Sequence, residues 1–273
     1  MGRTAPSEAV IAIGVWPRRT GKSMPRRSTL VEARVLLITG VAVVLGIAAA
    51  FIAQLLVALI ALVTNAAFYA RWSAASVSPA GHHLGAWVVV VPVIGGLLVG
   101  VMARWGSRAI RGHGIPEAME QVLLNESKIP PRITFLKPIS SAIAIGTGGP
   151  FGAEGPIIAT GGALGSFFGQ LLHVTGDERK VLLPAGAAGG MAAVFGSPVS
   201  AVILAVELLL FELRPRSLIP VALAAVAAAG VRYALVGNAP VFAMPHVAEP
   251  GIAALLCYVA LGALIGLISV GVT

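Results

Sequence analysis

The sequence predicts an all-α polytopic membrane protein whose helices are interrupted at glycine and proline. Two observations support this prediction. The 273 residues are 57% hydrophobic and only 11% charged, which is too apolar for a soluble domain of this length. Three apolar helices are also expected to begin at glycine-to-proline breaks, at Pro116, Pro156 and Pro198, because neither residue type continues a helix well.

The distribution of positive charge sets the expected topology. Residues 1–30 are polar and basic and are interpreted as a disordered cytoplasmic tail, ahead of a transmembrane domain over residues 31–273. Basic residues precede the first predicted span and follow the second, which places both flanks in the cytoplasm. The net charge of +8 therefore reflects topology, and no nucleic-acid partner is expected. Cys257 is the only cysteine, so an intrachain disulfide is excluded.

Apolar runs long enough to cross a bilayer follow the tail. The predicted spans are residues 35–63, 84–103, 218–235 and 251–270, with further apolar runs at 156–172 and 182–195. The run at 182–195 is crowded with alanine and glycine, which lets helices approach closely in lipid. His82 and His83, in the loop after the first span, lack cysteine or acidic neighbours, so no metal site is expected there.

Glu154 is the only charged side chain between Lys137 and Asp177. A carboxylate inside an apolar span costs roughly 2.5–3.5 kcal/mol on insertion scales, and broken backbone at membrane depth is tolerated only inside protein or beside a wet cavity. With Pro156 as the first residue of a new helix, free N–H groups would point at the Glu154 carboxylate. This predicts an anion site in which Glu154 occupies the place of an ion. The alternative is a carboxylate that only caps its helix.

The two other breaks open helices of the same kind. Glycines and Pro116 precede Glu117 in an expected first turn, and Pro198 opens the helix that carries Glu207. Some transporters hold anions at the converging starts of discontinuous helices. We therefore expect the starts of all three helices to gather around the Glu154 carboxylate.

Three motifs resemble those of the CLC family of chloride channels and proton/chloride exchangers. They are Gly112-His-Gly-Ile-Pro-Glu117, Gly152-Ala-Glu-Gly-Pro156, and Ala185-Gly-Ala-Ala-Gly-Gly-Met-Ala-Ala-Val-Phe195 followed by Pro198. The resemblance covers residues 35–273 in the order and spacing of the family. It implies a CLC-type fold, of which this chain is expected to be the N-terminal half of an inverted repeat, truncated at its C-terminus.

The same resemblance implies partners and a location. The family transports chloride or a similar anion, needs no further cofactor and usually forms homodimers with one pore per subunit. A multi-pass protein of a bacterial inner membrane is therefore expected. Its partners would be the lipid bilayer, a second copy of the chain and a missing C-terminal half.

The resemblance also assigns roles to individual residues. Glu154 matches the gating glutamate of the family, which competes with chloride and carries protons in the exchangers. Glu207 matches a structurally placed acid, for which a structural role, hydrogen-bonded or protonated, is favoured over a direct part in transport or a place on a proton path. Neither catalytic nor metal-binding residues are implied. The implied anion-binding residues are His113, Gly114 and Ile115 in the first motif and Gly155, Pro156 and Ile157 in the second.

Three departures from the family pattern modify these expectations. Ala153 replaces the usual Arg or Lys, which weakens the positive potential at the outer entrance. His113 replaces a serine; it either donates a hydrogen bond to the anion or turns away and leaves the backbone N–H groups to serve. Leu208 stands where exchangers often keep an inner proton-transfer glutamate, which favours a channel or a weakly coupled transporter.

Several functions remain open at this stage. The first is chloride transport through a pore gated by Glu154, incomplete in this chain, so that residues 1–273 alone conduct poorly or not at all. Proton-coupled exchange is the second, and a non-conducting truncated product or membrane scaffold is the third. An intramembrane enzyme is disfavoured, because Ser166 and Ser197 have no partner base and no catalytic or metal-binding motif occurs.

Overall fold

The computed structural model describes residues 33–112, 114–172, 174–237, 239, 241 and 250–272, and over these residues it contains helices and connecting turns but no strand. The helices are α1 (Ala33–Tyr69), α2 (Val90–Trp105), α3 (Ile115–Leu124), α4 (Pro131–Gly146), α5 (Glu154–Leu171), α6 (Gly176–Phe195), α7 (Pro198–Ala205), α8 (Pro215–Val236) and α9 (Ile252–Val272). Short helical turns are η1 (Pro79–Gly81), η2 (Gly85–Val89), η3 (Arg108–Ile110) and the π-helical η4 (Val206–Leu210). The all-α prediction is confirmed. The predicted tail and His113 lie outside the described residues.

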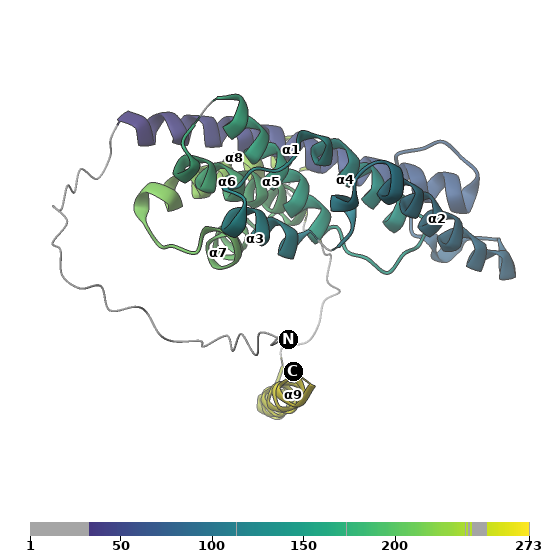
Figure 1. The fold of residues 1–273 in the computed structure, drawn as a ribbon. Helices are drawn as coiled ribbons and strands as arrows, with labels where there is room; N and C mark the ends of the chain where they lie inside the picture. Colours follow the sequence, from purple (N-terminus) through teal and green to yellow (C-terminus); the bar gives the residue numbers. More distant parts are fainter. Residues whose placement is uncertain are drawn as a thin grey trace, which may run out of the picture.

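Within the described residues, four helices are long and apolar enough to cross a membrane, and they coincide with the four predicted spans. They cover Arg34–Tyr69, Gly85–Trp105, Pro215–Val236 and Ile252–Val272. The last of these, α9, has no buried residue and is drawn apart from the other helices (Figure 1). The remaining long helices, α5 and α6, are largely buried inside the protein, and the spans α1 and α8 pack against them.

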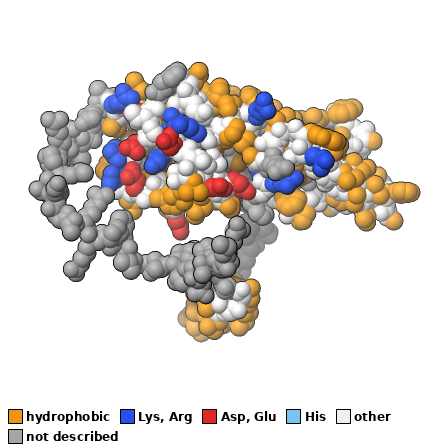
Figure 2. Space-filling model, viewed as in Figure 1, with side chains coloured by type: hydrophobic (Ala, Val, Ile, Leu, Met, Phe, Trp, Pro, Cys, Tyr) orange, Lys and Arg blue, Asp and Glu red, His pale blue; other side chains and the backbone are white. Residues whose placement is uncertain are grey.

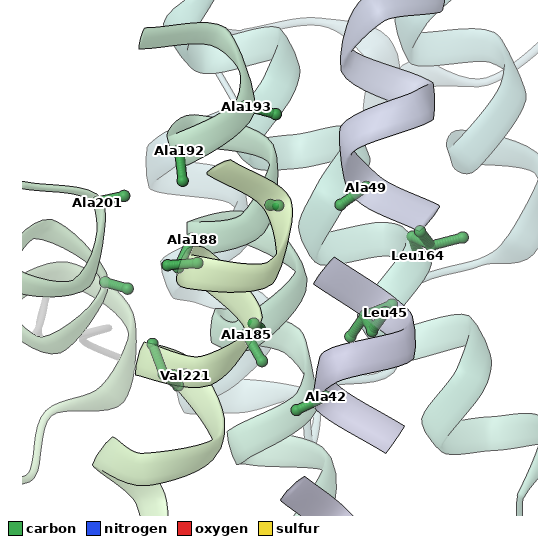
Figure 3. Close-up of a cluster of buried hydrophobic side chains, with 14 of the residues drawn as sticks. Ala42, Leu45, Ala49, Leu164, Ala185, Ala188, Ala192, Ala193, Ala201 and Val221 are labelled. Carbon is green, nitrogen blue, oxygen red and sulfur yellow. The ribbon is translucent and has the colours of Figure 1, made fainter. Parts of the chain in front are cut away.

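Helices α1, α5, α6 and α8 pack side by side to form the core (Figure 1). Figure 3 shows that this core is built mainly from alanine, with a few larger aliphatic side chains. The labelled members are Ala42, Leu45 and Ala49 of α1, Leu164 of α5, Ala185, Ala188, Ala192 and Ala193 of α6, Ala201 of α7 and Val221 of α8. Because alanine side chains are small, the helix backbones lie close to one another.

Glycines allow the closest contacts in this core. A methyl group at Gly161 of α5 would collide with the carbonyl oxygen of Gly186 of α6, and a methyl group at Gly186 would collide with that of Gly161. A methyl group at Gly165 would likewise collide with the carbonyl oxygen of Leu182, and one at Gly46 of α1 would collide with the carbonyl oxygen of Ala224 of α8. The predicted role of small residues in close helix packing is confirmed.

Charged side chains gather at one end of the molecule, whereas hydrophobic side chains cover most of the rest of the same face (Figure 2). At this end a cleft of about 750 Å³ lies between the starts of α1, α6 and α8. Arg34 forms an ion pair with Glu178 across the cleft, and Nε of Arg214 lies 3.3 Å from Oε2 of Glu212. Because the cleft includes the basic start of α1, it marks the end that the charge distribution assigns to the cytoplasm.

Candidate functional site

The turn before α3 is built on glycine and capped by an acid. Gly112 and Gly114 have φ angles of +89° and +99°, a region that glycine occupies without strain. The backbone N–H of Gly114 donates to Oε2 of Glu117 at 2.7 Å, so Glu117 caps α3. Pro116 is the second residue of α3, so the helix begins one position before the predicted start. The N–H of Gly114 is therefore already engaged by a protein acceptor.

A buried lysine holds the same turn from the opposite side. Lys137 of α4 is 3% exposed, and its Nζ donates to the carbonyl oxygens of Ile110 and Gly112, both at 2.9 Å. A buried ammonium group is costly unless its donors are satisfied, and here backbone carbonyls satisfy two of its three donors. The sequence prediction missed Lys137, which it treated only as the edge of an uncharged stretch. A lysine followed by Ser140 and Ser141 in an apolar run was the available signal.

Helix α5 begins at Glu154, two positions before the expected Pro156. Its first hydrogen bond runs from the N–H of Ile157 to the carbonyl oxygen of Ala153 at 3.0 Å, and proline has no N–H. Proline is tolerated at the third position because first-turn N–H groups have no partner within the helix. The N–H groups that precede the first hydrogen bond are those of Glu154 and Gly155. Ile157 is fully buried with its N–H engaged.

The starts of α3 and α5 meet without any side chain between them. A methyl group at Gly114 would collide with the carbonyl oxygen of Gly155 and would lie 3.0 Å from Cβ of Ala159. Glycine is therefore required at position 114 both for its φ angle and for the close approach of α5. For these two helices the predicted convergence is found.

The third helix start lies elsewhere. Gly196, which ends α6 with a φ of +65°, accepts a hydrogen bond at its carbonyl oxygen from the Tyr233 hydroxyl at 3.3 Å. A methyl group at Gly196 would lie 3.2 Å from Arg232. The cavity beside Glu154 has no α7 residue among its described lining. The start of α7 therefore does not join the other two at this cavity, and the connection that leads into it is bonded at Gly196 to the last turn of α8.

A cavity of about 610 Å³ opens where the starts of α3 and α5 face α4. Its lining includes Arg111, Gly112 and Ile115 before and in α3, Lys137, Ser140 and Ser141 of α4, and Glu154, Gly155 and Pro156 of α5. Gly114 and Ile157, two of the predicted anion-binding residues, lie behind this lining rather than in it. Cationic side chains and the positive ends of two helices face the cavity, opposed by the single carboxylate of Glu154. Such a field favours an anion.

The Glu154 carboxylate makes no hydrogen bond or ion pair with any described residue. Its side chain is exposed and folds back over Gly152, where a methyl group would collide with Oε2. The N-cap position of α5 is Ala153, and no side chain caps this helix. The alternative interpretation, in which Glu154 serves only as a helix cap, therefore receives no support from the geometry.

Glu207 does not belong to the cavity beside Glu154. It is exposed in the π-helical turn after α7, on a helix face that also exposes Val199 and Ile203. Glu207 makes no hydrogen bond or ion pair with the described residues and does not line the cavity. The hydrogen-bonded role expected for Glu207 is not seen within this part of the chain.

The fold and the site define a class of protein: a polytopic membrane protein in which discontinuous helices meet at a largely apolar cavity that also holds Arg111, Lys137 and Glu154. The chain matches the family described as voltage gated chloride channel over residues 95–273. It belongs to this family, the CLC family, and the resemblance of its motifs is confirmed.

Individual relatives agree with this assignment. An H(+)/Cl(-) exchange transporter ClcA from Vibrio campbellii is 30% identical over 204 residues, which are 71% of this chain and 42% of the relative. Chloride channel protein CLC-f from Arabidopsis thaliana is 31% identical over 195 residues, 67% of this chain and 24% of that protein. The chain therefore spans less than half the length of these relatives.

A solved structure supports the fold. The X-ray crystal structure of a slow cyanobacterial Cl-/H+ antiporter superposes with a TM-score of 0.64, covering 87% of this chain and 55% of that chain. The sequences are 22% identical, so this likeness concerns the fold alone. The predicted CLC-type arrangement of broken helices is confirmed.

Proposed function

We propose that this chain forms part of a pathway for chloride or a similar anion across a membrane, gated by Glu154. The observation that carries the proposal is the Glu154 carboxylate, which has no hydrogen-bond partner among the described residues and lines a cavity together with Lys137 and the start of α5. A carboxylate that no protein group holds can leave the cavity or take up a proton, and a free anion then fits the same positive field. The names of the relatives, a chloride channel and an exchange transporter, favour chloride as that anion.

The anion contacts are proposed residue by residue. Gly155 offers a backbone N–H, while Ile115 and Pro156 shape the cavity wall. Gly114 and Ile157 act indirectly, by letting the two helix starts meet and by fixing the first turn of α5. His113 remains a proposed contact, by resemblance to the serine of the family.

The working protein is proposed to be a homodimer in a bacterial inner membrane. The relatives are more than twice as long as the part this chain matches, so a second half of the family fold is proposed to complete each pathway. Residues 1–273 by themselves are accordingly expected to conduct poorly.

Proton-coupled exchange is the second candidate, because one relative and the structural neighbour are described as exchanging chloride and protons. Leu208, an apolar side chain beside Glu207, argues against a proton path at that helix. Proton uptake into vesicles driven by a chloride gradient would decide for exchange. A non-conducting scaffold is the remaining alternative and predicts no anion binding at all.

Catalysis is not proposed. The hydroxyl of Ser166 donates to the carbonyl oxygen of Ser127 at 2.6 Å and accepts from the N–H of Ile129 at 2.8 Å. Ser197 is hydrogen-bonded to Ser200 at 2.8 Å. Neither serine has a base among these partners, which a nucleophile requires.

Chloride binding tests the proposal without requiring conduction. Chloride would be titrated by calorimetry into the protein in nanodiscs, with Glu154→Gln and, as a matched control, Glu207→Gln. Glu154→Gln should bind chloride several-fold more tightly, roughly tenfold if the carboxylate occupies the site most of the time, whereas Glu207→Gln should match the wild type. Absence of binding in all three proteins, or equal affinity in the two variants, would reject an anion site competed for by Glu154.

A further inference from the structure

The outer loop between α1 and η2 places His82 against the end of α1. This loop, residues 70–84, joins two predicted spans on the side opposite their basic flanks, so it faces the outside. The half-buried His82 ring lies 5.9 Å from the ring of Phe68, centroid to centroid. Nδ1 of His82 accepts a hydrogen bond from the N–H of Leu84 at 3.2 Å. This bond requires an unprotonated Nδ1.

Phe68 connects His82 to the segment that leads to Glu154. Phe68 is 6% exposed, and a methyl group at Gly148 would lie 3.1 Å from its Cζ. Gly148 has a φ of +90° and belongs to the connection between α4 and α5, which ends at Glu154. Phe68 thus contacts the imidazole on one side and the backbone of this connection on the other.

The loop that contains His82 has no acidic residue that could pair with a protonated imidazole. Its other charged and titratable groups are held elsewhere or are exposed. Arg71 lies over the Tyr69 ring at 5.2 Å and donates to Oδ1 of Asn65, and the Tyr69 hydroxyl donates to the carbonyl oxygen of Ser78. His83 is exposed. The sequence has no Asp or Glu between Glu32 and Glu117. Along the chain, the acid nearest to Gly148 is Glu154, the first residue of α5.

We propose that His82 is an outer proton sensor that acts on the connection carrying Glu154. Imidazole changes charge between pH 5 and 8. A proton from the outer solution that binds Nδ1 removes the acceptor for the Leu84 N–H and turns this nitrogen into a donor. The ring then leaves its present position against Phe68, and Phe68 no longer supports Gly148. Acid outside therefore loosens the connection and makes the Glu154 side chain easier to displace.

Hydrogen–deuterium exchange tests the sensor without relying on anion transport. The protein in nanodiscs would be compared at several values between pH 5 and 8, with exchange times scaled for the intrinsic chemical rate, following peptides that cover residues 144–153. A loosening of the connection comparable to the net stability of one hydrogen bond predicts a roughly fivefold faster exchange of these peptides at the acid end. His82→Gln should abolish this acid-induced increase, and the matched change at the exposed neighbour, His83→Gln, should preserve it.

A Glu154→Gln background separates the two titratable groups. The increase should persist in Glu154→Gln, because the proton acts at His82. If the increase survives in His82→Gln, vanishes in Glu154→Gln or is missing from the wild type, then His82 is not the sensor. None of these outcomes depends on whether the chain conducts chloride.

Discussion

Glu178 and Glu154 both lie in the first turn of a helix in the same membrane protein, but they are held in opposite ways. Glu178, at the start of α6, pairs with Arg34 and accepts hydrogen bonds from the N–H and hydroxyl of Thr175. Glu154, at the start of α5, has no such partner among the described residues. Glu117 at the start of α3 resembles Glu178, since it caps its helix.

The contrast shows that capping by a first-turn acid is available to this chain and is used at α3 and α6. At α5 the N-cap position is an alanine and the acid faces a cavity instead. An acid whose position is not fixed by the fold is suited to movement, whereas the two capping acids stabilise helix starts. The following predictions test this division, beginning with the largest expected effect.

Lys137→Met should destabilise the protein most. It leaves two backbone carbonyl oxygens without their charged donor, and hydrogen bonds to charged groups are worth about 1.5–3 kcal/mol each, partly offset by relief of the desolvation of the ammonium group. We expect a loss of at least about 2 kcal/mol in the free energy of unfolding in detergent. The exposed Lys180 of α6, changed in the same way, is the control. Equal stabilities of the two variants would show that Lys137 does not hold the turn before α3.

Glu117→Ala should cost about 1–3 kcal/mol, because it leaves the N–H of the buried Gly114 without a partner. Glu120, exposed on the same helix, supplies the matched control as Glu120→Ala, which should change the free energy of unfolding by less than about 0.5 kcal/mol. If Glu117→Ala is as stable as the wild type, Glu117 does not stabilise the start of α3, and it resembles Glu154 rather than the capping acid Glu178.

Glu178→Ala should cost about 1 kcal/mol at neutral pH, the usual value of a cap, with the exposed ion pair adding little. The Arg34 hydrogen bond is the main cause that lowers the pKa of Glu178 from 4.5 to about 2, in a first turn outside the four candidate spans. A lowered pKa means that this stabilisation is complete above pH 4.5 and is lost as the pH falls toward 2.

Thermal unfolding at neutral pH and across that acid window measures this linkage. The difference in melting temperature between wild type and Glu178→Ala should shrink as the pH falls from 4.5 toward 2. For Asp177→Ala, at the exposed neighbouring position, the difference in melting temperature from the wild type should change less with pH over the same range. A difference that stays constant across the window would mean that Glu178 is not held by Arg34.

Glu154→Gln should have the smallest effect on stability, within about 0.5 kcal/mol, because no described group is bonded to the carboxylate that it replaces. The same substitution is expected to have the largest effect on anion binding. Glu207→Gln serves as the control for both measurements. A loss of stability as large as that of Glu117→Ala would indicate that Glu154 caps α5 and would remove the contrast between the helix starts.

The sequence by itself determined the all-α membrane class, the four spans, the glycine-to-proline breaks and the family resemblance, and it predicted a gating role for Glu154. These features are local: hydropathy, the missing N–H of proline and the backbone freedom of glycine act within a few residues. Even so, α5 begins two residues before Pro156, because proline is tolerated anywhere in a first turn.

Only the tertiary structure decided which helix starts meet. It brings α5 to α3 through Gly114 and holds the connection between α6 and α7 against α8 through Tyr233. It also gives Lys137 its carbonyl partners on a turn distant in the sequence. The three helix starts have similar local sequences, so their different environments follow from long-range packing, which spacing and composition do not encode.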